Sequence, residues 1–237
     1  MRFLSKGVDM SIQVKAAVVC AIVSGCALFH SCATMAEETQ NDVNYGDPTA
    51  SYRGLGVQRT NDGTQASLVF GTGEHIASAD FGLQDNGKDY NYRVRYFNVD
   101  QDNGFGLSVD FIGGKTGDTT SNGLLGGMVQ KFELTPNVML VPILAAGKVG
   151  AQDNGHKVDS WIAQPGLYAM YGFDAGHWLY ANPKATYVYE AKDWTNELEL
   201  GGGYMLTDEF SIGFKHELSK VNGKTDSKTW VNLYYYF

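Results

Sequence analysis

The residues of this 237-residue chain that could do chemistry are charged side chains placed at every second position of short segments. Arg93 and Arg95 alternate with tyrosine and valine, and Glu197 and Glu199 alternate with leucine. Successive side chains of a β-strand point to opposite faces, so such segments gather charge on one face and apolar groups on the other. Charges that line a confined space can select solutes, or they can pair with one another and fill that space.

The candidates for the charged face come from many parts of the chain. They are Asp80, Arg93, Arg95, Asp110, Lys131, Glu133, Lys184, Glu197, Glu199, Lys215 and Glu217, and Gln164, Asn182 and Glu190 are expected beside them. The segment with Arg93 and Arg95 lies between those that bear Asp80 and Asp110, so these charges are expected to pair across neighbouring strands. Acidic members outnumber basic ones, which predicts a preference for cations if a pore is open.

Catalytic and metal-binding patterns are incomplete. Cys20, Cys26 and Cys32 all lie in the N-terminal segment, which leaves no thiol chemistry for the rest of the chain. His75, His156 and His177 fall in or beside expected turns, and His216 lies within a segment whose next residue, Glu217, points to the opposite face. We therefore expect no enzyme, no cofactor and no metal site.

Turn chemistry recurs along the chain. Gln-Asp-Asn-Gly occurs at 84–87, 101–104 and 152–155, and Asn-Gly pairs tolerate the positive φ of tight hairpins. Between the turns lie segments that alternate apolar and polar residues. We expect strands at 51–59, 65–71, 76–83, 89–98, 104–112, 123–134, 138–149, 157–173, 178–190, 197–206, 210–218 and 228–237.

This alternation is typical of a transmembrane β-barrel, although a soluble sandwich also alternates. Charge mixed with glycine on the polar face favours a lumen. The pattern predicts an all-β, antiparallel up-and-down barrel over residues 51–237 with 12 strands, or with 8 or 10 if some weak segments are loop or plug.

The last strand has an apolar face made of Val231, Leu233, Tyr235 and Phe237, and the final residue is aromatic. In this it resembles the C-terminal strand of Gram-negative outer membrane β-barrel proteins. The resemblance implies that this strand closes the barrel and serves as an insertion signal for the barrel-assembly machinery. It also implies location in the cell outer membrane, with outer membrane lipid and lipopolysaccharide as partners.

The N-terminus has the pattern of an export signal. Lys15 precedes the apolar run 16–28, and a small-residue site predicts cleavage after Ala36. Residues 1–36 are therefore assigned to a signal peptide, and residues 37–50, which are polar, to a flexible periplasmic leader. The tetrapeptide that ends at Cys26 also resembles a lipoprotein cleavage box, which leaves lipidation there as an alternative.

A periplasmic C-terminus assigns the two sides by alternation. Short periplasmic turns are expected at Asp100–Asn103, Thr135–Asn137, Asp174–Gly176 and Thr207–Glu209. Longer outer loops are expected at Gly113–Asn122, Gly150–Lys157, Ala191–Asn196 and Ser219–Lys228. Short inner turns and longer outer loops are usual for outer membrane barrels.

These features favour a narrow, porin-like channel for small hydrophilic solutes. The first alternative is a closed barrel with a structural or surface-interaction role through its outer loops. Lipid-modifying enzymes and proteases also exist on this fold, but Leu218 stands where the lipid deacylases would have a serine two residues after the histidine. The formal net charge of −8 argues against nucleic acid as a partner.

Overall fold

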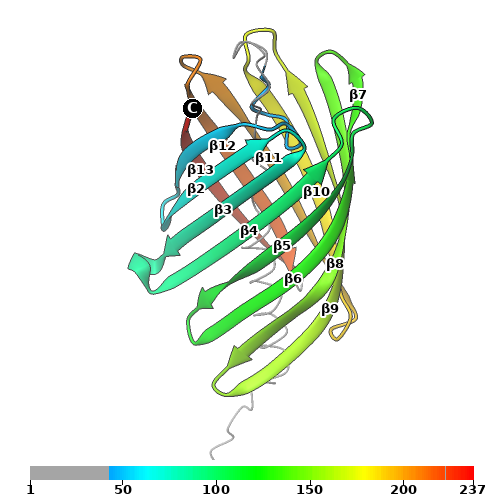
Figure 1. The fold of residues 1–237 in the computed structure, drawn as a ribbon. Coiled ribbons are helices and arrows are strands. Elements are labelled where there is room, and N and C mark those ends of the chain that lie inside the picture. Colours follow the sequence, from blue (N-terminus) through cyan, green and yellow to red (C-terminus); the bar gives the residue numbers. More distant parts are fainter. Residues whose placement is uncertain (1–42, 222) are drawn as a thin grey trace, which may run out of the picture.

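The computed structural model describes residues 43–221 and 223–237 and consists of one antiparallel sheet closed on itself (Figure 1). Its strands are β1 (Arg53–Arg59), β2 (Gly63–Thr72), β3 (His75–Gln84), β4 (Asp89–Val99), β5 (Phe105–Thr116), β6 (Thr119–Gln130), β7 (Phe132–Thr135), β8 (Val138–Asp153), β9 (His156–Gly172), β10 (Trp178–Val188), β11 (Asp193–Met205), β12 (Phe210–Val221) and β13 (Lys224–Tyr236). The predicted signal peptide and the alternative at Cys26 lie outside the described residues.

The barrel has 12 strands with one extra strand, and most consecutive strands are neighbours in space. β1 pairs with β13 and β6 pairs with β8, which closes the ring. Short β7 pairs with β8 beyond the end of β6 and is the extra strand. Each segment predicted as a strand contributes to this barrel, so the prediction of 12 strands is confirmed and the alternatives of 8 and 10 are wrong.

Alternation decides which side chains face the lumen. Arg93, Arg95 and Lys215 are only 5%, 4% and 1% exposed, whereas Leu107 and Phe214 are 57% and 48% exposed on the outer surface. An apolar exterior around a charged interior suits lipid outside and water inside. This is the architecture of an outer membrane β-barrel.

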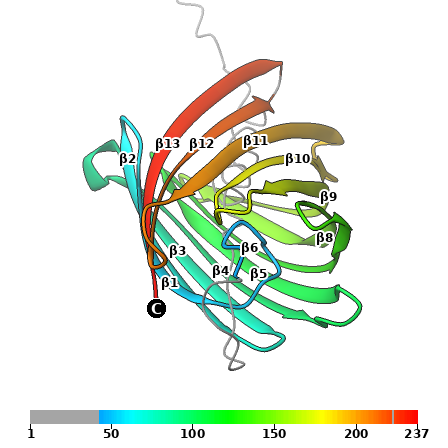
Figure 2. The same ribbon diagram turned by 90° about the horizontal axis from the view of Figure 1, so that it is seen from above.

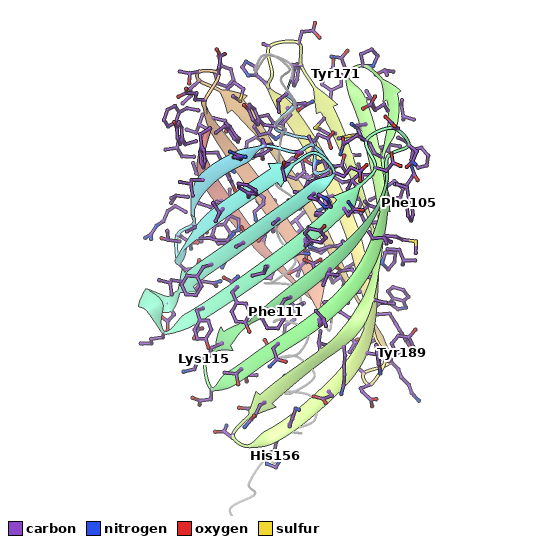
Figure 3. The ribbon with its side chains drawn as sticks, viewed as in Figure 1. Phe105, Phe111, Lys115, His156, Tyr171 and Tyr189 are labelled. Atoms are coloured by element: carbon purple, nitrogen blue, oxygen red, sulfur yellow. The ribbon has the colours of Figure 1, made fainter. Side chains whose placement is uncertain are left out.

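Aromatic side chains lie on the outer surface near both ends of the barrel. Tyr171 and Phe105 lie toward the end that holds the C-terminus, called here the C-terminal end (Figure 3). Tyr189 lies toward the opposite, far end in the same view, and His156 marks the far tip of the β8–β9 hairpin. Amphipathic rings favour the boundary between lipid and water, so the two groups fit the interfaces of one membrane. No helix among the described residues is long and apolar enough to cross a bilayer.

Connections at the far end are as short as those at the C-terminal end, so the predicted long outer loops are wrong. β5 and β6 are joined only by Gly117 and Asp118, and β8 and β9 only by Asn154 and Gly155. Gly117, Asn154 and Gly155 have φ of +60°, +46° and +85°, the left-handed values that tight hairpins need.

The other two predicted outer loops are also mostly strand. β11 begins at Asp193, β12 ends at Val221 and β13 begins at Lys224. In these stretches the paired strands extend beyond the residues that alternate between apolar and polar. Because that alternation is the sequence pattern of lipid-facing strands, the sequence did not mark these residues as strand.

Residues 43–50, called here the inner segment, lie inside the ring of strands (Figure 2). Tyr45, Asp47 and Thr49 are 5%, 5% and 2% exposed. The polar sequence predicts a flexible leader here, and the structure differs because specific contacts hold the segment. The ring of Tyr45 stacks on that of Tyr236 with centroids 3.8 Å apart, so the inner segment is tied to the last strand.

Candidate functional site in the barrel lumen

Nine charged side chains face the lumen at mid-height and form what we call the charged belt. They are Asp80, Arg93, Arg95, Asp110, Lys184, Glu197, Glu199, Lys215 and Glu217. Each stands at an inward position because the strand period of two residues places every second side chain on the lumen face. All nine were predicted from the sequence as lumen residues.

On one wall, Asp110 of β5 accepts hydrogen bonds from two arginines of β4. Arg93 donates through Nε to Oδ1 at 2.8 Å and through Nη2 to Oδ2 at 3.0 Å. Arg95 donates through Nε to Oδ1 at 2.7 Å. Arg95 stands directly opposite Asp110 in the strand register, and Arg93 is two residues away on the same face. One carboxylate thus compensates two guanidinium groups in a geometry that favours strong bonds.

On the opposite wall, strands β10, β11 and β12 carry a second group of paired charges. Lys184 forms an ion pair with Glu197, which stands opposite it in the register. Lys215 Nζ lies 2.8 Å from Glu217 Oε1 and 3.9 Å from Glu199 Oε2.

Two aromatic side chains complete this wall. The hydroxyl of Tyr180 donates to Glu199 Oε1 at 2.7 Å. The indole Nε1 of Trp230 donates to Glu217 Oε2 at 3.0 Å. Both acidic groups therefore have a neutral donor in addition to the charge of Lys215.

These ion pairs share one geometric property. Each joins residues on the same strand or on adjacent strands, so the bonds run around the wall of the barrel. None of these pairs crosses the lumen from one wall to the other. The belt holds four basic and five acidic groups, so its formal charge is 4 − 5 = −1.

Other predicted lumen residues lie outside the belt. Lys131 follows β6 near the C-terminal end, where its Nζ lies 3.0 Å from Asp47 and 2.6 Å from Glu133. The side chain of Glu133 is 67% exposed on β7, and Glu190 is exposed in the turn between β10 and β11. Within the charged belt, the acidic excess is therefore a single charge.

The pair of Lys131 with Asp47 also holds the inner segment in place. Burial alone would lower the pKa of Lys131, but the nearby carboxylates of Asp47 and Glu133 and the hydrogen bonds to them raise it above 10.5. The hydroxyl of Tyr168 donates to the carbonyl of Gly46 at 2.8 Å from the facing wall. Sequence reasoning missed these roles because residues 43–50 show no alternation that would signal them.

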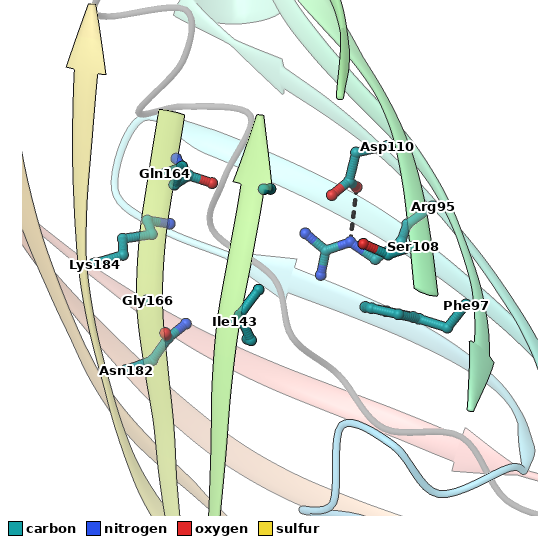
Figure 4. Close-up of a pocket in the computed structure, with 10 residues that line it drawn as sticks. Arg95, Phe97, Ser108, Asp110, Ile143, Gln164, Gly166, Asn182 and Lys184 are labelled. Atoms are coloured by element: carbon teal, nitrogen blue, oxygen red, sulfur yellow. Dashed lines mark hydrogen bonds and ion pairs between the residues drawn. The ribbon is translucent and has the colours of Figure 1, made fainter. Parts of the chain in front are cut away.

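A pocket at mid-height, called here the constriction pocket, brings the two walls together (Figure 4). Arg95, Ser108 and Asp110 line it from β4 and β5, and Gln164, Asn182 and Lys184 line it from β9 and β10. β4 and β10 are not neighbours in the sheet, so the pocket spans the lumen between separate parts of the wall.

A second pocket, called here the outer pocket, lies closer to the far end. Its lining includes Glu197, Glu217, Asp226 and Lys228. Three carboxylates against one ammonium make it more acidic than the constriction pocket. Among the described residues, no group of three or more His, Cys, Asp or Glu side chains is placed to hold a metal ion.

No known family matches the sequence, and no curated protein does. Solved structures do share the fold. An outer membrane channel from Pseudomonas putida F1 aligns with a TM-score of 0.54 and 12% identity over 78% of this chain and 96% of that chain. The NanC porin aligns with a TM-score of 0.51 and 12% identity over 78% and 98%. The β domain of the Bordetella autotransporter BrkA aligns with a TM-score of 0.50 and 13% identity over 78% and 97%.

Proposed function

Since the chain has the fold of an outer membrane β-barrel, we propose that it forms a narrow channel for small hydrophilic solutes. The observation that carries the proposal is the direction of the ion pairs in the charged belt. Because each pair joins neighbouring strands or residues of one strand, none of them crosses the lumen from wall to wall. The similar fold of the NanC porin and of the channel from Pseudomonas putida F1 supports the same proposal.

Under this proposal the C-terminal end faces the periplasm and the far end faces outward. A solute would pass from the acidic outer pocket to the constriction pocket, and then past the inner segment. The formal charge of −1 in the belt favours cations only weakly. We therefore expect a slight cation preference, in the direction that the sequence predicts.

The test is single-channel recording in planar bilayers with a cysteine placed at Ser108, in the constriction pocket. A bulky thiol-specific reagent should reduce the conductance of Ser108→Cys because it would occupy the narrow part of the lumen. The matched control is Leu107→Cys on the same strand, whose side chain faces outward and is 57% exposed. The proposal would be overturned if the reagent lowered the conductance of both variants equally. It would also be overturned if the protein showed no channel openings.

A closed barrel is the second candidate function, and the inner segment favours it. Asp47 and Tyr45 lie buried at the C-terminal end of the lumen, where a plug would sit. A closed barrel with a structural role would give no channel openings. The short hairpins at the far end offer little surface for a binding role through outer loops.

A further inference from the structure

The outer pocket has room for a small solute. It encloses about 70 Å³ that water can enter. A single water needs roughly 10–15 Å³ of such space, so a solute of about five heavy atoms fits. Gln65, Gln84 and Asn91 line the pocket from β2, β3 and β4, and residues of β11, β12 and β13 complete the lining. This space suits a small ion or amine.

Three carboxylates of the outer pocket are arranged around Ser219 of β12. Glu197 of β11 and Asp226 of β13 stand opposite Ser219 in the strand register, and Glu217 lies two residues before it on the same face. Side chains that stand opposite one another in an antiparallel pair lie about 5 Å apart at Cβ, and diagonal neighbours lie somewhat farther. The negative charge is therefore concentrated on one part of the lumen wall.

The basic residue of the pocket is directed to other partners. Lys228 stands opposite Glu217 in the register, but its Nζ lies 3.3 Å from Asp62 Oδ1 and donates to Gln84 Oε1 at 3.1 Å. Asp226 accepts a hydrogen bond from the backbone N–H of Ser227 at 3.0 Å and forms no ion pair with any described residue. One carboxylate of the lining thus lacks a compensating charge.

The amide of Gln65 is a second, independent sign of a ligand. Gln65 is only 5% exposed and lines the pocket. Its Nε2 donates to Asp80 Oδ1 at 3.5 Å, and its carbonyl Oε1 accepts no hydrogen bond from any described residue. Buried amide oxygens are nearly always hydrogen-bonded, so an acceptor left in a pocket indicates a donor that enters there.

We propose that the outer pocket binds a small organic cation with several N–H donors, a guanidinium or primary ammonium compound. The positive charge compensates Asp226, because Glu197 and Glu217 are already paired with Lys184 and Lys215. The N–H groups donate to carboxylate oxygens and to the free carbonyl of Gln65. A planar guanidinium matches carboxylates especially well, since its N–H groups form a fork.

This inference rests on the proposed channel, because it names the class of solute that the far end of the lumen takes up. It differs from the weak preference for cations in the charged belt, which depends on charge alone. The outer pocket requires hydrogen-bond donors on the cation as well.

Trp230 provides a local signal for binding. It lines the outer pocket, and its indole Nε1 donates to Glu217 Oε2 at 3.0 Å. The other three of the chain's four tryptophans, Trp161, Trp178 and Trp194, do not line the pocket. The indole N–H resonance of Trp230 therefore reports on the site, and the other three are internal controls.

The test is a titration of the isotope-labelled, folded protein in detergent micelles, followed by NMR, with the Trp230 signal assigned from Trp230→Phe. Guanidinium chloride replaces tetramethylammonium chloride at constant ionic strength, so only the N–H donors and the shape of the cation change. The Trp230 signal should shift and saturate, while the other three indole signals stay in place. Urea, which is planar and has N–H donors but no charge, should have no effect. An equal shift with urea or with sodium chloride would overturn the proposal.

Two matched variants test the role of Asp226. Asp226→Asn should weaken guanidinium binding about tenfold, because it removes a hydrogen bond to a charged group. Asp118→Asn makes the same charge change in the exposed turn between β5 and β6, outside the pocket, and should bind as the unaltered protein does. Both aspartates are exposed, so both variants should fold. Equal binding by the two variants would overturn the proposal.

Gln65→Leu tests the neutral acceptor. It removes the free carbonyl but keeps an apolar group of similar size, and it should also weaken guanidinium binding. Unchanged binding in this variant would contradict the assignment of its carbonyl to the ligand.

The outcomes also separate this proposal from the channel. A saturable Trp230 shift without channel openings would remove the channel and leave the site. Channel openings together with an unshifted Trp230 signal would remove the site and leave the channel.

Discussion

At the scale of single residues, the alternation of side chains explains why the charged belt could be predicted. Arg93, Arg95 and Asp110 sit well inside strands, where the period of two fixes the face. Glu190 sits in the turn after β10, where the chain leaves the alternation, whereas Lys131, just beyond β6, pairs with Asp47 of the inner segment.

Asp110 is expected to be the most sensitive residue of the belt. Asp110→Asn would remove the charge that compensates two buried arginines, and breaking a buried ion pair costs about 3 kcal/mol. Urea unfolding of the protein in detergent should show this loss. The control is Asp80→Asn: Asp80 accepts a hydrogen bond from the neutral amide of Gln65 at 3.5 Å, longer than the bonds from Arg93 and Arg95 to Asp110, so its effect should be smaller.

The ion preference should follow the charge of the belt. Glu217→Gln keeps an acceptor for the indole of Trp230 but raises the belt charge from −1 to 0, so the weak cation preference should disappear. Reversal potentials in a salt gradient measure this. Glu190→Gln makes the same charge change in an exposed turn and should leave the preference nearly as it was; an equal shift in both variants would contradict a selective belt.

At the scale of elements, the inner segment departs most from the sequence prediction, because it lies inside the barrel and was expected to be a flexible leader. Its contacts join Tyr45 to Tyr236 and Gly46 to Tyr168, residues far apart in the sequence, so a local pattern could not reveal them. The hairpins at the far end were missed for a different reason. Their polar strands extend beyond the apolar band, and polar sequence was interpreted as loop.

Packing around Gly46 gives a way to displace the inner segment. A Cβ at this position would lie 2.4 Å from Cγ of Trp178, so Gly46→Val cannot fit without movement. We expect the segment to leave the lumen, with higher conductance and faster proteolysis near residue 46. Gly126→Val is the control, because a Cβ there meets no atom within 4 Å. Unchanged conductance in a Gly46→Val protein whose segment is cleaved would show that the segment does not obstruct the channel.

The ion pair of Lys131 with Asp47 predicts how docking of the segment depends on pH. The pKa of Lys131 is raised in the folded protein, so this stabilisation is fully present below its usual value of 10.5 and is lost as the pH rises through the higher folded value. Proteolysis near residue 46 should therefore stay slow through neutral pH and accelerate only in strong alkali. In Lys131→Met that alkaline step should be absent.

At the scale of the whole molecule, the sequence specified the closed barrel because periodicity, turn chemistry and the terminal strand agree with one another.

The terminal strand is also predicted to act as an insertion signal, and this role can be tested separately from folding. Phe237→Ser should lower the amount of protein in the outer membrane several-fold if this residue serves as an insertion signal, while refolding in detergent should be unaffected. Phe173→Ser is the control, since Phe173 is also an outward aromatic residue, 44% exposed. Equal levels of the two variants would argue against the signal.

The lengths of β8 and β9 have a consequence for how the molecule meets its surroundings. A strand of 17 residues is about 55 Å long at roughly 3.3 Å per residue, and at a tilt near 45° it rises about 40 Å, against an apolar band of about 25 Å. The β8–β9 hairpin projects farthest at the far end (Figure 1). Under the proposed orientation and channel function, large polymers outside the cell would be screened from the lumen on that flank and could approach it more closely on the opposite flank, where the rim is lower.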